Sequence, residues 1–168
     1  MPVTPETLYA RLDELGIAYT HHEHPPVYTV AEASTFYTQI PGGHCKNLFL
    51  RDRKKSNWLV VAQHDTPLEL KRLNGLLQTS KLTLGRPERL WEILGVIPGA
   101  VTPFALLNDI ERQVRVVVER RLLEHQTLNF HPLVNTVTTG IAPADLLGFL
   151  EAEGYSPRIL DLSADSPP

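Results

Sequence analysis

The sequence is poor in the features that mark secreted and membrane proteins. It contains a single cysteine in 168 residues, so no internal disulfide can form and a reducing compartment is expected. Its most membrane-like stretch, VIPGAVTPFALL, is interrupted by two prolines and is shorter than the roughly 20 apolar residues of a spanning helix. The first residues, MPVTPETLYARLDELG, lack the basic and apolar regions of a signal peptide. We therefore expect a cytoplasmic protein without a membrane partner.

Common catalytic and cofactor motifs are missing as well. The sequence has no GxGxxG, GxxxxGK[ST], HExxH or GxSxG, so dinucleotide, P-loop, zincin and hydrolase-elbow interpretations lack support. Among the seven histidines, His22 and His24 share one face of an expected strand. Two ligands do not make a metal site. We therefore expect neither a metal nor a cofactor.

Charge is distributed unevenly along the chain. Residues 44–90 contain ten Lys or Arg against four acids, a net +6, whereas the whole chain is −3 and the remainder is therefore −9. A local basic surface on an acidic protein suits the docking of one polyanion in one orientation. The alternative is an ordinary solvated face on which positive charges happen to cluster.

The pattern of elements favours one α+β domain with a mixed, mostly antiparallel sheet flanked by helices. Short turns join most of the expected strands, and the expected helices fall between groups of strands. Helices are predicted at 4–16, 30–37, 68–77, 86–95 and 143–154, and strands at 17–24, 45–52, 57–63, 114–120, 128–132 and 135–141. The domain is expected to span residues 1–162, with 163–168 as a disordered tail.

Residues 42–61, GGHCKNLFLRDRKKSNWLVV, place a lysine at the beginning of an apolar strand. Because side chains alternate between the faces of a strand, Lys46 is expected on the side of Leu48, and Cys45 and Asn47 on the other. Lys46 is then either a surface lysine where a strand emerges or a cation that holds an anionic or polar ligand. Cys45 points away from Lys46, so it is expected to be a small buried residue and not an activated nucleophile.

Two further features are candidates for a site. The stretch LGVIPGAVTPFALLND is rich in glycine and proline, which build a rigid loop whose backbone N–H groups can face a ligand. His131, in NFHPLVNT, sits where a strand meets a proline turn. Taken alone, the loop is equally typical of a simple turn, and the histidine of a structural residue.

Four segments in this order resemble the YbaK/ProX superfamily of aminoacyl-tRNA deacylases: HPPVYTVAEA, GGHCKNLFLRDRKKSNWLVV, KLTLGRPERLWEILGVIPGAVTPFALLND and NFHPLVNTVTTGI. The resemblance covers nearly the whole chain and is greatest to free-standing relatives of the bacterial prolyl-tRNA synthetase editing domain, the ProXp-ala type. It implies an enzyme that hydrolyses alanine mistakenly attached to proline tRNA. The implied partners are the acceptor end of that tRNA and prolyl-tRNA synthetase.

The resemblance also implies a set of site residues. Lys46 is expected to hold the terminal nucleotide, Gly95 begins the loop that lines the aminoacyl pocket, and His131 helps to bind the aminoacyl end; these three are the expected catalytic residues. The implied substrate-binding residues are Asn47, Lys81, Pro98, Gly99 and Thr102. Many YbaK-type members have threonine in place of Asn47, so asparagine favours the ProX branch. Lys81 stands where relatives often have arginine, and it keeps the charge but loses the planar two-pronged donor.

The implied chemistry explains why no catalytic triad is present. An aminoacyl ester is already activated, so a positioned water and a stabilised oxyanion suffice, and the ribose 2′-hydroxyl of the substrate is implied to assist. Two alternatives remain open at this stage. One is deacylation of a different aminoacyl-tRNA, such as cysteinyl- or seryl-tRNA, and the other is a nucleic-acid-binding regulator that keeps the fold without hydrolysis. The oligomeric state is left open.

Overall fold

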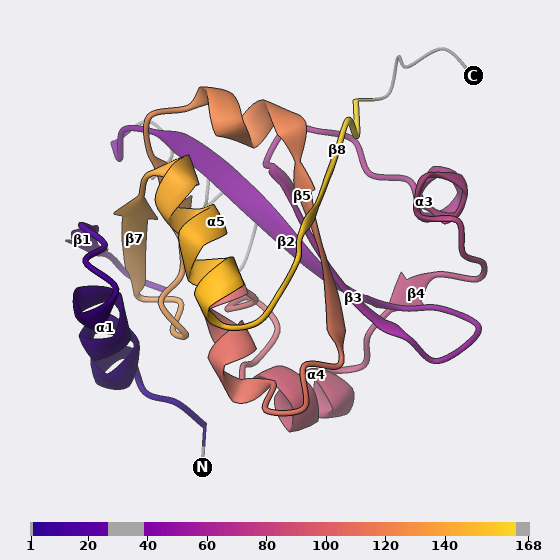
Figure 1. The fold of residues 1–168 in the computed structure, drawn as a ribbon, viewed down its shortest axis with the longest axis horizontal. Helices are drawn as coiled ribbons and strands as arrows, with labels where there is room; N and C mark the ends of the chain where they lie inside the picture. Colours follow the sequence, from indigo (N-terminus) through magenta and orange to yellow (C-terminus); the bar gives the residue numbers. More distant parts are fainter. Residues whose placement is uncertain (1, 27–38, 164–168) are drawn as a thin grey trace.

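Strands and helices alternate in groups along the residues that the computed structural model describes, 2–26 and 39–163 (Figure 1). In chain order they are α1 (Pro5–Glu14), β1 (Thr20–Glu23), β2 (Gly43–Arg51), β3 (Asn57–Gln63), α3 (Leu70–Leu77), β4 (Thr83–Leu84), α4 (Pro87–Leu94), the 3-10 helix η1 (Pro103–Asn108), β5 (Val114–Glu119), the 3-10 helix η2 (Arg120–Glu124), β6 (Leu128–Phe130), β7 (Val137–Ile141), α5 (Pro143–Ala152) and β8 (Arg158–Leu160). The expected helix at 30–37 and residues 164–168 of the expected tail lie outside the described residues. None of the described helices is long and apolar enough to cross a membrane.

The helices begin and end where the sequence has proline, threonine and glycine. The Thr4 hydroxyl accepts a hydrogen bond from the Thr7 N–H at 3.2 Å, and Pro5 occupies the first turn of α1. Gly16 follows that helix with φ +70°, and Gly95 ends α4 with φ +63°. Both glycines adopt the left-handed conformation that favours a residue without Cβ, which is why the predicted helix ends are confirmed.

The eight described strands form one mixed sheet in the order β1-β7-β6-β2-β3-β5-β8, with β4 paired to β2 outside this order. Four strand pairs are antiparallel, and three are parallel: β2–β6, β3–β5 and β5–β8. The predicted α+β class with a mixed sheet is confirmed, as are the hairpins β2–β3 and β6–β7. The sequence does not predict β4 and β8, because strands of two or three residues carry too little periodicity to be recognised.

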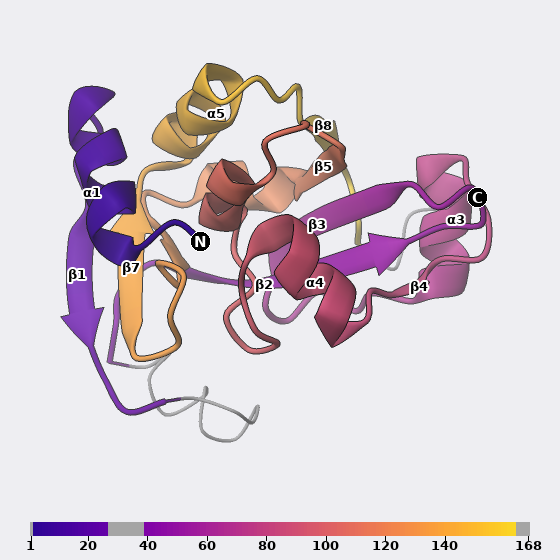
Figure 2. The same cartoon turned by 90° about the horizontal axis from the view of Figure 1, so that it is seen from below.

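Strand β2 has a different apolar cluster on each face. Phe49 belongs to the cluster that also holds side chains from α1, α4 and α5, and Cys45 packs against it. Leu50, with Leu48 packed beside it, belongs to the cluster formed with α3. The helices accordingly lie on both sides of the sheet (Figures 1 and 2). The predicted alternation along β2 is therefore confirmed, with Cys45 and Lys46 on opposite faces.

One edge of β2 is paired only near its two ends. Strand β3 pairs with the other edge from Cys45 to Arg51. On this edge, β6 pairs at Gly43 and His44, and β4 pairs at Leu50 and Arg51. From residue 45 to residue 48 no described strand pairs with this edge, which we call the open edge of β2. At about 3.3 Å per residue the open edge is roughly 13 Å long. A ligand at this edge can contact side chains on both faces of the strand.

The turn between β2 and β3 is fixed by a buried carboxylate. Asp52 is 7% exposed, and its Oδ1 accepts hydrogen bonds from the backbone N–H groups of Lys54 and Ser56. Its Oδ2 accepts from Trp58 Nε1 at 2.9 Å and from the Thr79 hydroxyl at 2.7 Å. Burial alone would raise the pKa of Asp52, but these four hydrogen bonds outweigh it and the pKa is lowered. The carboxylate thus ties the hairpin to the residues that follow α3.

Replacing this carboxylate by an amide should destabilise the fold in a pH-dependent way. At pH 7, Asp52→Asn should lower the free energy of unfolding by about 1–3 kcal/mol, because the amide nitrogen leaves buried donors without an acceptor. Since the folded-state pKa is lowered, the wild-type contribution is present above the unfolded-state pKa of about 3.9 and is lost as the pH falls through the folded value. Urea unfolding at pH 7 and at acid pH measures the difference, which should shrink in acid. The exposed control Glu111→Gln should match wild type, and an equal Asp52→Asn loss at both pH values would contradict the assignment.

Candidate active site

Lys46 lies half-buried at the open edge of β2, opposite Ala62 on β3. It extends on the α3 face, the side of Leu48, as the alternation predicts. Burial lowers the pKa of its ammonium, and the charges of Glu119 and Asp65 partly offset this effect. Within the described part of the chain Lys46 makes no direct ion pair. It is therefore a cation that has neighbouring carboxylates and still has its donors available for a ligand.

Asn47 joins β2 to the glycine–proline loop on the opposite face. Its Nδ2 donates to the carbonyl oxygen of Val101 at 3.2 Å, and Val101 packs against the cluster that contains Phe49. The Oδ1 of Asn47 is buried and accepts no hydrogen bond from the described residues. Asn47 therefore ties the loop to β2 through its amide N–H group.

The loop begins at Gly95, whose role in the structure is to end α4. Its N–H donates to the carbonyl of Trp91 at 3.0 Å, so this N–H is committed to the helix. A Cβ at Gly95 would lie 2.9 Å from Asn108 Nδ2 and 3.0 Å from Pro2 Cβ, which excludes any larger residue. The predicted contact of Gly95 with an ester must therefore use its carbonyl or the residues that follow it, and that contact stays a prediction.

The rest of the loop divides into an exposed tip and a buried end. Pro98 and Gly99 are exposed, and a Cβ at Gly99 would meet no heavy atom within 4 Å. Thr102 is fully buried, and its hydroxyl accepts from the Phe104 N–H at 3.3 Å as the cap of η1. The tip is thus accessible to a ligand, whereas the Thr102 side chain is occupied in the structure. Their substrate contacts, implied by the family resemblance, remain predictions.

His131 lies just beyond β6, the strand that ends at one side of the open edge. The last ladder pair of β2 and β6 joins His44 to Asn129, so Lys46 and His131 each stand two residues further along neighbouring strands. A carbonyl oxygen only accepts, so Nδ1 of His131 donates to the Val137 carbonyl at 3.0 Å and Nε2 remains an acceptor. Burial lowers the pKa of His131, which keeps the ring neutral near pH 7.

Lys81 lies at the other end of β2. It is exposed, with φ +53°, and it precedes β4, whose Thr83 pairs with Arg51. The five residue steps from Lys46 to Arg51 span roughly 16 Å of strand. The structure therefore does not bring Lys81 next to Lys46. This separation allows Lys81 to contact the acceptor stem of the tRNA, outside the aminoacyl pocket.

The described contacts group the predicted residues into two sets on the two faces of β2. Asn47 and the loop lie on the helix-rich face, and Lys46 lies on the α3 face with Glu119. The sequence analysis did not single out Glu119, although one signal was present: it is an acid that ends the valine-rich strand VRVVVE. Among the described residues, no group of three or more His, Cys, Asp or Glu could hold a metal ion.

The sequence of this chain matches a known family. A model of the aminoacyl-tRNA editing domain family matches residues 24–149. The match includes all of β2, the glycine–proline loop and His131. The chain belongs to this family.

Individual relatives define the branch of the family. The chain is 42% identical over 164 residues to prolyl-tRNA synthetase associated domain-containing protein 1 of Danio rerio, covering 94% of this chain and 89% of the relative. It is 36% identical over 158 residues to the prolyl-tRNA editing protein ProX of Acetoanaerobium sticklandii, covering 94% and 96%. The solved structure of "a putative trans-editing enzyme for prolyl tRNA synthetase" has a TM-score of 0.74 at 18% identity over 97% of this chain and 98% of that one, which shows the shared fold. The predicted YbaK/ProX assignment is confirmed, and the chain is an aminoacyl-tRNA deacylase.

Cys45 should be dispensable for the reaction. Burial raises the pKa of its thiol strongly, and the side chain packs against the helix-rich core on the face away from Lys46. Cys45→Ala should therefore keep most of the single-turnover deacylation rate and lose about 1 kcal/mol of unfolding free energy, the value of a small buried group. Rate and urea unfolding are measured on the same preparation. A folded variant without activity would restore a thiol mechanism.

Proposed function

We propose that this chain edits in trans, by hydrolysing the ester of alanyl-tRNA(Pro). The observation that carries the proposal is the placement of Lys46 and Asn47, consecutive residues on opposite faces, at the open edge of β2. A ligand at this edge would reach both faces. The name of the Acetoanaerobium relative supports proline tRNA as the carrier, and that of the Danio relative supports prolyl-tRNA synthetase as a partner. The lone cysteine suits the reducing cytoplasm, where we place the protein.

The two faces would divide the substrate between them. On the α3 face, the Lys46 ammonium would hold the phosphate or ribose of the terminal nucleotide by charge-assisted hydrogen bonds. On the other face, the exposed loop tip at Pro98 and Gly99 would receive the aminoacyl group, and Asn47 would hold this loop to β2 through Val101. Neutral His131 would offer Nε2 as an acceptor at the end of the same edge.

The reaction needs positioning more than a strong nucleophile. Water adds to the ester carbonyl carbon, the bond to the ribose oxygen breaks, and the ribose oxygen takes up a proton. The vicinal 2′-hydroxyl of the substrate would orient the attacking water. Fixing an already activated ester, the water and the oxyanion donors in one geometry supplies the rate enhancement.

Selection of alanine would be a matter of size. A synthetic pocket built for proline cannot strongly exclude alanine, because a missing methylene is worth only ~1–3 kcal/mol of discrimination. A second, smaller pocket reverses the selection by admitting alanine and excluding proline. The backbone of the glycine–proline loop, held to β2 through Asn47 and Val101, would set the size of that pocket.

A deacylation panel tests the proposal directly. Wild-type protein should release alanine from alanyl-tRNA(Pro) faster than it releases cysteine, serine or proline from the corresponding charged tRNAs. Lys46→Ala should lower the single-turnover rate constant about 10- to 100-fold, since a charge-assisted contact is worth roughly 1.5–3 kcal/mol and ~1.4 kcal/mol is tenfold. Its melting temperature should barely change, because no buried partner is left unpaired.

The matched control is Arg158→Ala, which removes an exposed cation from β8, outside the basic segment 44–90. It should hydrolyse like wild type. Faster release of cysteine or serine than of alanine would redefine the substrate within the enzyme class. Binding of tRNA without release of any of the four amino acids would point to a regulator. A wild-type rate in Lys46→Ala would overturn the assignment of the site.

The basic segment 44–90 would bind the acceptor stem. Lys54 and Lys55 are exposed in the hairpin turn between β2 and β3, at the end of β2 away from Lys46 and on the same side of the fold as Lys81 and β4. With the terminal adenosine near Lys46, the stem would extend along β2 toward this turn. Phosphates of the stem would then meet the lysines.

Reversing the two turn charges should weaken tRNA binding and reduce its salt dependence. Each phosphate contact contributes a log–log slope of about −0.7 to −0.9, so Lys54→Glu with Lys55→Glu should remove up to about two such increments. Binding is measured by fluorescence anisotropy at several salt concentrations. Arg120→Glu, a charge reversal outside the segment, is the control and should retain the wild-type slope. Unchanged affinity and slope in the double variant would move the footprint elsewhere.

A further inference from the structure

Three side chains lie in register across the centre of the sheet, on its α3 face. Lys46 on β2 is directly opposite Ala62 on β3. The parallel ladder of β3 and β5 ends at Val61 and Val118, so the next residues along these strands are Ala62 and Glu119. Neighbouring strands are about 4.8 Å apart, which places the backbones of Lys46 and Glu119 roughly 10 Å from one another. Ala62, with its single methyl group, is the residue between them in this row.

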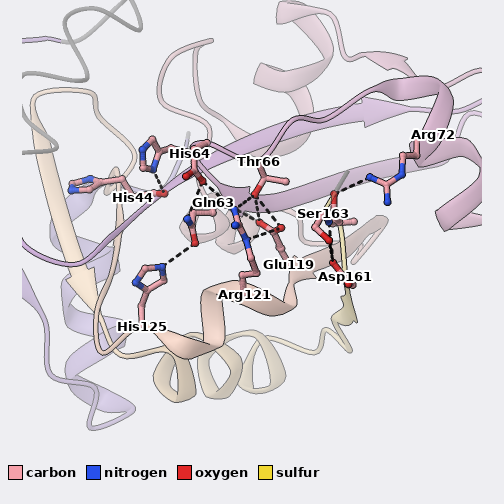
Figure 3. Close-up of polar contacts among 12 residues, drawn as sticks. His44, Gln63, His64, Thr66, Arg72, Glu119, Arg121, His125, Asp161 and Ser163 are labelled. Carbon is pink, nitrogen blue, oxygen red and sulfur yellow. Dashed lines mark hydrogen bonds and ion pairs between the residues drawn. The ribbon is translucent and has the colours of Figure 1, made fainter. Parts of the chain in front are cut away.

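Glu119 is surrounded by polar partners from the end of β3, the turn that follows it and η2 (Figure 3). Its side chain is fully buried, and Oε1 accepts hydrogen bonds from the Gln63 N–H at 2.9 Å and the Thr66 hydroxyl at 2.8 Å. Arg121 Nε lies 3.5 Å from Oε2, and its NH2 donates to Thr66 Oγ1. Gln63, Thr66 and Arg121 therefore direct donor groups either at the Glu119 carboxylate or at the Thr66 hydroxyl that donates to it. The arrangement fixes a negative charge in the sheet, which is costly unless cations face it.

The titratable and charged groups near Lys46 and Glu119 come from the end of β5, the turn after β3 and η2. Glu119 ends β5, Asp65 and His64 follow β3, and Arg121 belongs to η2. His44 on β2 packs its ring against that of His64. Asp65 is more than half exposed and already paired with Arg121, whereas Glu119 is wholly buried. A buried charge is screened less than an exposed one, so Glu119 exerts the stronger field on Lys46.

We propose that Glu119 is the positioning residue for Lys46, and that its buried carboxylate attracts the Lys46 ammonium and directs the side chain across Ala62. This inference rests on the proposed function, in which Lys46 holds the terminal nucleotide. Glu119 touches no substrate in this role. Because its oxygens are occupied by Gln63, Thr66 and Arg121, it attracts the ammonium without consuming the donors that the nucleotide needs.

The first test reads Lys46 without any tRNA. The chain has five lysines, so selective ¹³Cε labelling gives few signals, and Lys46→Arg identifies the signal of interest by its loss. Titration should show a lower pKa of Lys46 in Glu119→Gln than in wild type, because the compensating charge is gone while the hydrogen-bonding shape is kept. Asp65→Asn is the matched control and should shift the pKa in the same direction by less. Glu119→Asp, which keeps the charge, should return it toward the wild-type value.

A second variant guards against loss of folding in Glu119→Gln. Ala62→Val leaves the carboxylate in place and puts a larger side chain between the two groups, so the pKa of Lys46 should fall there as well. An unchanged pKa of Lys46 in both folded variants, or a larger shift in Asp65→Asn than in Glu119→Gln, would overturn the proposal. The result of these titrations does not depend on whether the chain releases alanine from tRNA.

Deacylation then connects the pair to the reaction. In single-turnover assays corrected for spontaneous ester hydrolysis, Glu119→Gln should lower the rate constant of wild-type protein but should have little further effect in Lys46→Ala, because the side chain that it positions is gone. A purely structural role would lower the rate constant equally in both backgrounds. If the titration shows the coupling but wild-type protein releases no alanine from alanyl-tRNA(Pro), the proposed substrate fails and the positioning role stands.

Discussion

Strand β2 must suit two different cores at once, and the arrangement of the candidate site follows from this constraint. Its odd residues pack toward α1, α4 and α5, and its even residues toward α3. Two consecutive polar residues on such a strand are therefore separated by the sheet itself. They can serve one ligand only at an edge, and the sheet supplies that edge because β6 and β4 pair with β2 just at its ends. The short neighbouring strands thus have a functional consequence.

The site has no strong nucleophile, and its polar groups are arranged for binding. Cys45 is packed against the core, and His131 is held neutral with one nitrogen bound to a backbone carbonyl. What the residues at the open edge provide is a cation on one face of β2 and, on the other, the glycine–proline loop held by Asn47. In the proposed function these two faces would receive the terminal nucleotide and the aminoacyl group, respectively.

Local features of the fold could be predicted from the sequence, whereas features that depend on register between distant segments could not. Proline and glycine indicate the helix ends, and the period of two assigns Lys46 and Cys45 to opposite faces. The proximity of Glu119 to Lys46 depends on the pairing of three strands, two of them parallel and more than 50 residues apart. The capping role of Thr102 and the helix bond of the Gly95 N–H depend on atomic contacts that no periodicity reveals. The family resemblance supplied the residues of the site, but not their division between two faces.

The turn at Asp52 has a consequence for how this family can vary. Inserting or deleting one residue within β2 would turn every following side chain to the other face, placing Lys46 or its neighbours in the wrong core. The turn cannot absorb the shift, because Asp52 binds Lys54, Ser56, Trp58 and Thr79 at fixed positions. A change of length in this hairpin would therefore disturb both cores, whereas the exposed tip of the glycine–proline loop has no ladder to keep in phase.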